Sequence, residues 1–160
     1  MPSNSTSAEF PHGKRLRLGR NSEPRRAYLI TTVTYRRMPV FGDFRLGRAL
    51  VTCMRHHHDC GQVVSLAFVI MPDHLHWLLQ LGSDATLPAL MRSFKGYSAK
   101  RINELRADGA KQLWQAGYHD HAVRREADIR RLARYVVANP LRAGLARNMA
   151  DYPLWDAIWF

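Results

Sequence analysis

One stretch limits the fold of this chain more than any other: residues 62–81, with the sequence QVVSLAFVIMPDHLHWLLQL. Its first half is an apolar, β-branched run, which is typical of a buried strand. Pro72 and Asp73 interrupt the run, and a second apolar run extends from His74 to Leu81. Two such runs separated by a two-residue break predict an antiparallel hairpin. The chain is therefore expected to contain an antiparallel sheet built around this hairpin.

The segments around the hairpin supply two more strands and three helices. A run rich in β-branched and aromatic residues predicts a first strand over 28–35, and a shorter run predicts a strand over 121–124. Apolar residues at helical spacing, with Asp43 as an N-cap and Pro140 as a stop, predict helices over about 43–58, 87–107 and 126–139. The predicted order is thus βαββαβα.

This order predicts an α+β fold, in which a ferredoxin-like βαββαβ unit forms an antiparallel sheet and one additional helix follows at the C-terminus. We expect the helices to pack on one sheet face and the other face to stay open. A chain of 160 residues fits a single compact domain. Residues 1–24 are rich in serine, proline and arginine and predict a flexible basic arm, which leaves 25–160 as the folded domain.

The charge of the chain indicates its ligand. A formal net charge of +11 and a pI near 10.5 are typical of proteins that bind nucleic acid, although a solvated basic surface is the alternative. No apolar run reaches the roughly 18 residues needed to span a bilayer, so we expect a cytoplasmic, nucleoid-associated protein without a membrane partner. Cys53 and Cys60 flank three histidines, but their spacing matches no standard zinc site.

Two pairs of polar residues are candidates for chemistry. His74 and His76 lie two apart on a predicted strand, so both imidazoles are expected on one sheet face, where they can converge on a cation. Tyr135 and Asn139 lie four apart on the last helix and share one of its faces. From spacing alone, a structural role is the more common reading of each pair. A divalent ion that polarises a phosphate and a tyrosine that attacks phosphorus would together cleave and rejoin DNA without water or ATP.

The chain resembles a known family in three blocks that occur in the family's order: FVIMPDHLHWLLQL, LMRSFKGYSAKRIN and LWQAGYHDHAVRREADIRRLARYVVANPLRAGL. The resemblance spans about Tyr28 to Trp155 and is to the REP-associated tyrosine transposases, relatives of the IS200-like, single-tyrosine HUH transposases. It implies that His74 and His76 hold a metal and that Tyr135 is the nucleophile. Asn139 stands where related transposases carry a glutamine that completes the metal site, so it is the candidate third ligand.

The resemblance also implies a substrate and supporting residues. The expected substrate is single-stranded or hairpin DNA of the repetitive extragenic palindromic (REP) type, cut through a 5′-phosphotyrosine intermediate. Asp120 and His121 are expected to support the site by hydrogen bonding. Tyr97 is the rival nucleophile because it lies in a basic helix. The residues expected to contact DNA lie on the last two long helices or just before the second of them: Arg92, Lys95, Arg101, Arg124, Arg125, Arg130, Arg131 and Arg134.

The identity of the metal, the oligomeric state and the activity each have an alternative. Oxygen and imidazole ligands beside a phosphate favour Mg²⁺ or Mn²⁺ over zinc. By resemblance a monomer is preferred, with a homodimer as the alternative. A single-stranded nucleic-acid-binding module or a catalytically silent regulator on the same fold would be the alternative to an enzyme.

Overall fold

The structure is a computed structural model and describes residues 23–158, so most of the expected N-terminal arm lies outside the described residues. The strands are β1 Ala27–Val33, β2 Val63–Met71, β3 His74–Leu81, β4 His119–Ala122 and β5 Trp155–Ala157. The α-helices are α1 Phe44–Asp59, α2 Leu87–Leu105, α3 Glu126–Val137 and the single turn α4 Asn139–Arg142. Short 3-10 turns occupy Tyr35–Arg37, Val40–Gly42 and Met149–Asp151.

The strands form one antiparallel sheet in the order β4-β1-β3-β2-β5. The predicted hairpin is confirmed, because β2 and β3 pair from Met71 opposite His74 outward and leave Pro72 and Asp73 as the turn. The predicted βαββαβ order of the first six long elements is also confirmed. The additional strand β5 pairs with β2 and extends the sheet at that edge.

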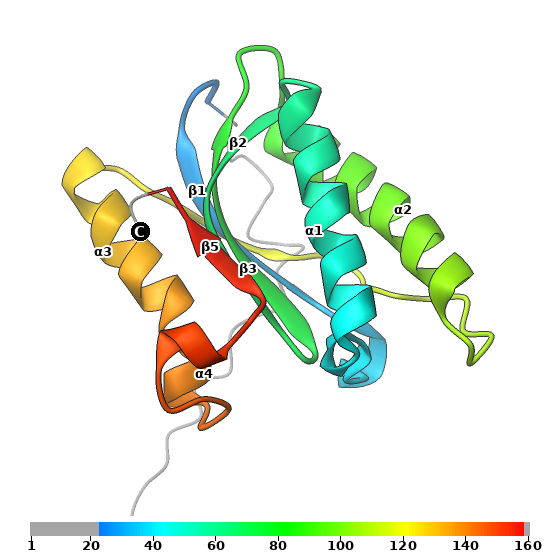
Figure 1. Ribbon diagram of the computed structural model, residues 1–160. Helices are drawn as coiled ribbons and strands as arrows, with labels where there is room; N and C mark the ends of the chain where they lie inside the picture. The colour runs from blue at the N-terminus through cyan, green and yellow to red at the C-terminus, as the bar shows by residue number, and fades with distance from the viewer. Residues whose placement is uncertain (1–22, 159–160) are drawn as a thin grey trace, which may run out of the picture.

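Helices cover both faces of the sheet (Figure 1). Leu75, Trp77 and Leu79 of β3 belong to the main core beneath α1 and α2. The alternate residue Leu78 packs against α3 on the opposite face. The expectation of an open face is therefore wrong. The physical reason is that β2 is buried on both faces from Leu66 to Met71, and an apolar strand of this kind needs cover on each side.

Two further predictions need correction in the last third of the chain, and one strand there was not predicted. The fourth strand begins at His119, two residues before the predicted start. Pro140 does not stop the helical run, because it occupies the first turn of α4, where a missing N–H is tolerated. The strand β5 was not predicted because three residues are too few to display an alternating pattern.

The packing of α1 against α2 contains a buried histidine. His57 donates its Nδ1–H to the carbonyl oxygen of Cys53 at 2.9 Å, and its Nε2 accepts from the Ser93 hydroxyl at 3.1 Å. Burial lowers the pKa of His57, since the charged imidazolium is poorly solvated there. Within residues 23–158, no helix is both long and apolar enough to cross a membrane.

Candidate active site

His74 and His76 open strand β3, immediately after the Pro72–Asp73 turn. Their ring centroids are 4.7 Å apart and the rings stand almost perpendicular, at 83°. Both side chains are partly buried, which leaves part of each ring open to a ligand. The period of a strand places both rings on the same face, as the sequence predicted, and α3 covers that face.

Each of the two rings is held through its Nδ1 atom. Nδ1 of His74 lies 2.7 Å from a carboxylate oxygen of Asp73, and that carboxylate also accepts from Arg37 at 3.2 Å. Nδ1 of His76 lies 2.8 Å from the hydroxyl of Thr31, the residue directly opposite on β1. A histidine that donates Nδ1–H to an oxygen keeps the lone pair of Nε2 available. The two Nε2 atoms are thus the ones left to bind a ligand.

The charge state of this pair suits a metal site. Burial lowers the pKa of His76 to about 4, helped by the nearby charges of His74 and Arg142, so the ring is neutral near neutral pH. Burial alone would raise the pKa of Asp73, but its hydrogen bonds and ion pairs with His74 and Arg37 outweigh burial and lower it. A neutral imidazole backed by a carboxylate or a hydroxyl is the usual form of a histidine ligand.

Helix α3 brings Tyr135 to the same end of the sheet. Val136 packs in a small cluster with Val69 and Met71 of β2. These two residues stand opposite His76 and His74 in the strand register. Tyr135 precedes Val136 on the helix, and its side chain is 54 % exposed. The predicted nucleophile is thus carried by the helix that packs on the sheet face of the predicted ligand pair.

Asn139 follows Tyr135 by one helical turn and has an unusual amide. Its Nδ2 atom is buried and has no hydrogen-bond partner. A buried, unpaired amide is costly, and a half-turn of the side chain would present its oxygen instead. Two imidazole nitrogens and an amide oxygen form a donor set that fits a divalent cation. Among residues 23–158, no group of three His, Cys, Asp or Glu side chains offers an alternative site.

Arg142 also lies at this site, although the sequence did not predict it. Its guanidinium carbon lies 3.9 Å from the centroid of the Tyr135 ring, and one of its N–H groups donates to the Tyr135 carbonyl at 2.7 Å. Its charge also acts on His76. Positions 135, 139 and 142 share one face of a helix, so the spacing alone could have indicated Arg142. It was missed because Pro140 was expected to end the helix.

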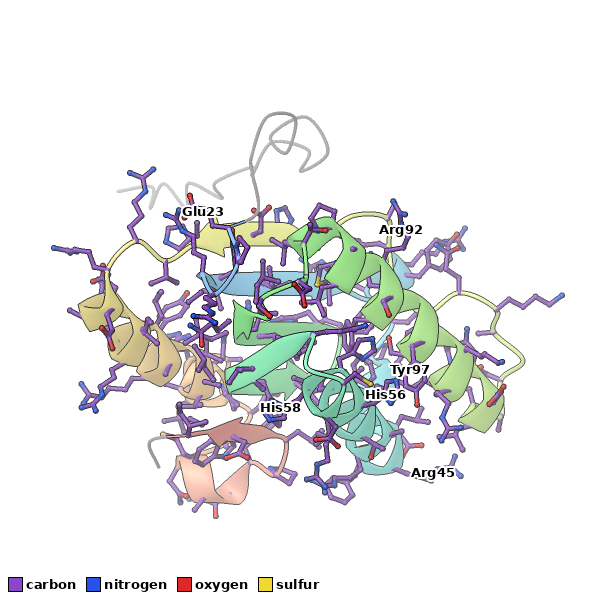
Figure 2. The ribbon with its side chains drawn as sticks, turned by 90° about the horizontal axis from the view of Figure 1, so that it is seen from above. Glu23, Arg45, His56, His58, Arg92 and Tyr97 are labelled. Atoms are coloured by element: carbon purple, nitrogen blue, oxygen red, sulfur yellow. The ribbon has the colours of Figure 1, made fainter. Side chains whose placement is uncertain are left out.

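Tyr97, the rival nucleophile, lies on the opposite side of the sheet. It projects from α2 and stacks on His56 of α1, with ring centroids 4.4 Å apart and planes 9° apart (Figure 2). The α1 and α2 pair covers the face to which Trp77 points, rather than the face of His74 and His76. The structure does not bring Tyr97 together with the histidine pair.

The polar cluster at residues 119–121 divides between the two faces of β4. Asp120 stands opposite Ile30, whose side chain belongs to the core beneath α1 and α2. His119 stands opposite Thr31, which is itself opposite His76. The face of His76 therefore carries His119 and His121 rather than Asp120, and His119 is the residue in its cross-strand row. The expected supporting role of Asp120 beside the histidine pair does not fit this geometry.

The basic residues expected to contact DNA occupy two regions. Arg92 and Arg101 are exposed on α2, whereas the Lys95 ammonium donates to the carbonyls of Gln115 and Gly117 at 2.7 and 2.6 Å. The second region surrounds a surface groove of about 730 Å³ along the edge of β4 and the start of α3. Its lining includes the expected DNA-binding residues Arg124, Arg125 and Arg131 and the expected supporting residues Asp120 and His121. Arg130 and Arg134 are exposed on α3 itself.

The fold and the site define a class: an α+β domain in which a histidine pair on a central strand faces a helix that carries a tyrosine. The chain belongs to the family described as transposase IS200 like, whose model matches residues 25–139. That match covers the histidine pair, Tyr135 and Asn139, and it ends just before Arg142.

The chain is also similar to two individual proteins. A REP-associated tyrosine transposase from Escherichia coli K12 is 32% identical over 89 residues, which are 54% of this chain and 50% of the relative. The chain thus matches about half the length of this curated relative. A REP-associated tyrosine transposase solved with a REP hairpin bound shares the fold, with a TM-score of 0.66 and 24% identity over 85% of this chain and 79% of that one.

Proposed function

We propose that this protein cleaves and rejoins single-stranded DNA with Tyr135 as the nucleophile. The observation that supports the proposal is the packing of α3: Val136, the neighbour of Tyr135, packs against Val69 and Met71, which stand opposite His76 and His74 in the strand register. The 54 % exposure of Tyr135 supports it, since a nucleophile must be reached by its substrate. Family membership makes the same chemistry the expected one.

In the proposed reaction, the phenol oxygen of Tyr135 attacks a backbone phosphorus and forms a 5′-phosphotyrosine bond. The bond between phosphorus and the 3′ oxygen breaks, and that oxygen leaves as a 3′-hydroxyl after it takes up a proton. The proton of the phenol passes to solvent. The phosphoester is conserved in the protein–DNA link, so a second 3′-hydroxyl can reverse the step and join a different strand.

His74, His76 and Asn139 would hold a divalent ion, Mg²⁺ or Mn²⁺, beside the reacting phosphate. When bound, such an ion polarises the phosphate and neutralises charge that develops during the transfer. The residues of this chain supply the remaining parts. Asp73 and Thr31 orient the two rings, and the α3 packing orients Tyr135.

We further propose that the DNA is a palindromic repeat folded as a hairpin. The Escherichia coli relative is named a REP-associated tyrosine transposase, and the structural relative was solved with a REP hairpin. The arginines around the groove beside β4, together with Arg130 and Arg134 on α3, form a surface suited to phosphate contacts. This surface lies beside the helix that carries Tyr135.

The decisive experiment compares the wild type with Tyr135→Phe on end-labelled hairpin oligonucleotides with single-stranded flanks. With Mg²⁺ or Mn²⁺, the wild type is expected to give a covalent protein–DNA band on a denaturing gel, and a chelator should remove it. Tyr135→Phe should lose the band completely but retain its affinity for the same DNA, because only the attacking oxygen is removed. Tyr97→Phe is the matched control and should keep the band.

The alternative functions predict different outcomes. A binding module or a silent regulator would bind the hairpin tightly, yet neither would form a covalent band with any metal. An adduct in Tyr135→Phe that disappears in Tyr97→Phe would show that the nucleophile is misassigned, while the enzyme class would stand.

A further inference from the structure

Arg142 is held against the side chain that the proposed reaction requires. Its guanidinium stacks on the Tyr135 ring at 3.9 Å, and one of its N–H groups donates to the carbonyl oxygen of Tyr135 at 2.7 Å. The hydrogen bond holds the guanidinium at the backbone of Tyr135, and the stacking contact holds the Tyr135 ring against the guanidinium. An exposed tyrosine would otherwise sample several rotamers, so these contacts restrict the direction of its phenol oxygen.

Arg142 also belongs to the helical segment that covers the face of the histidine pair. It is the last residue of α4, which continues directly from the helix that carries Tyr135. That helix packs its Val136 against Val69 and Met71, which stand opposite His76 and His74 in the strand register. The side chain that contacts the proposed nucleophile thus comes from the segment that covers the proposed metal ligands.

The guanidinium keeps most of its hydrogen-bonding capacity for a ligand. An arginine has five N–H donors, and in the described part of the chain one of them forms a hydrogen bond within the protein. The side chain is exposed and can be reached from solvent. A planar guanidinium binds phosphate oxygens in pairs, which an ammonium cannot do.

We propose that Arg142 positions the Tyr135 ring for attack and donates its remaining N–H groups to the phosphate of the bond that is cut. This inference rests on the proposed function and adds no reactant to it: the bonds that form and break remain those given above. Arg142 would thus hold the nucleophile and the phosphorus in one arrangement, with the guanidinium as the common contact. Positioning of this kind matters in the transition state more than in simple DNA binding.

The test is the rate of covalent adduct formation in a single turnover at saturating hairpin DNA, measured beside the dissociation constant. Arg142→Ala is expected to slow adduct formation by about 100-fold, since losing a positioning or charge-stabilising contact has effects of this order. Its affinity for DNA should fall by less than about tenfold, because one phosphate contact is lost among several. Arg142→Lys should recover part of the rate, because it keeps the charge but not the planar stack.

Chemical rescue separates a positioning role from a structural one. Low millimolar methylguanidinium should accelerate Arg142→Ala when compared with the same concentration of sodium chloride. The matched control is Arg48→Ala, an exposed arginine on α1 at the other side of the sheet, which should keep the wild-type rate with or without methylguanidinium.

Two results would overturn the inference while the proposed function stands. One is a wild-type rate for Arg142→Ala; the other is a slow Arg142→Ala that neither lysine nor methylguanidinium improves. Absence of an adduct from the wild type itself is a separate outcome, because it would remove the proposed function as well.

Discussion

At the scale of single residues, the candidate site includes side chains that hold the two histidine rings in place. Thr31 and Asp73 occupy the Nδ1 atoms of His76 and His74 and so determine which nitrogen of each ring is left for a ligand. Neither was among the residues chosen from the sequence. A threonine on a strand has no distinguishing pattern, and its role becomes visible only when the register places it opposite His76.

Thr31→Val should weaken metal binding. Valine keeps the shape of threonine but removes the hydroxyl that orients His76, and loss of such a partner typically costs about 10–100-fold in metal affinity. Calorimetric titration of the variant with Mn²⁺ measures the effect directly. The matched control is Thr32→Val, because Thr32 is the next residue of β1, points to the opposite face and has a buried hydroxyl without a partner. Equal Mn²⁺ affinity in the two variants would contradict the proposed role of Thr31.

At the scale of helices and strands, the long elements follow from the sequence and the short ones do not. Strand β3 was predicted with its bounds, because a proline-containing turn and a clear apolar run define both ends. Helix α3 was predicted too, but its cover of the second sheet face was not, since the pattern of a helix does not say where it packs. The position of α4 was obscured by Pro140, which terminates many helices but here lies in a first turn.

Most of the candidate site could be predicted from the sequence, but the residues whose position depends on strand register could not. His74, His76, Tyr135 and Asn139 were chosen from the sequence with help from a family resemblance, and the helix that carries Tyr135 packs on the strand residues opposite the histidine pair. Asp120 was chosen with them, but the strand register turns it to the other face. The sequence predicted the start of β4 two residues too late and did not predict how β4 pairs with β1. The face on which Asp120 lies is therefore known only from that pairing.

The α1–α2 interface should make stability depend on pH. Burial holds the pKa of His57 below its ordinary value of 6.5 in the folded protein. Below about pH 6.5, His57 is therefore protonated in the unfolded chain but stays neutral in the folded protein. As a result, the free energy of unfolding falls as the pH is lowered from about 6.5 toward the pKa of His57 in the folded protein. Urea unfolding of the wild type between about pH 7.5 and 5 should show this decrease.

His57→Gln isolates this contribution, because glutamine keeps a polar group but does not titrate. The variant is expected to be less stable near neutral pH, where the hydrogen bonds to Cys53 and Ser93 are lost or altered. Its stability should nevertheless fall less between about pH 6.5 and 5 than that of the wild type. Parallel curves for the two proteins would show that His57 does not contribute to the acid sensitivity.

At the scale of the whole molecule, the net charge of +11 should make the proposed DNA binding sensitive to salt. The proposed function places the DNA on the side of α3, where Arg130 and Arg134 are exposed. Replacing both with alanine should reduce the slope of log affinity against log salt by about 1.4–1.8, since each lost phosphate contact contributes about 0.7–0.9. Fluorescence anisotropy at a series of salt concentrations measures the slope.

The control for this prediction is a double variant of equal charge, Arg48→Ala with Arg55→Ala. Both arginines are exposed on α1, which covers the opposite face of the sheet. The slope should stay at the wild-type value in this control. If the two double variants lose the same slope, binding follows the overall charge of the protein rather than the surface around α3.

The strand β5 has a consequence for the order of events in strand exchange. The helix that carries Tyr135 is joined to the sheet on both sides, through β4 before it and through β5 after it, and the Tyr152 hydroxyl adds a 2.6 Å hydrogen bond to the Ile70 carbonyl. A DNA end attached to Tyr135 would therefore be bound to a helix whose two ends are both connected to the sheet. Such an end cannot be carried far while both connections are intact, so the incoming 3′-hydroxyl would have to come to the site where the first strand was cut.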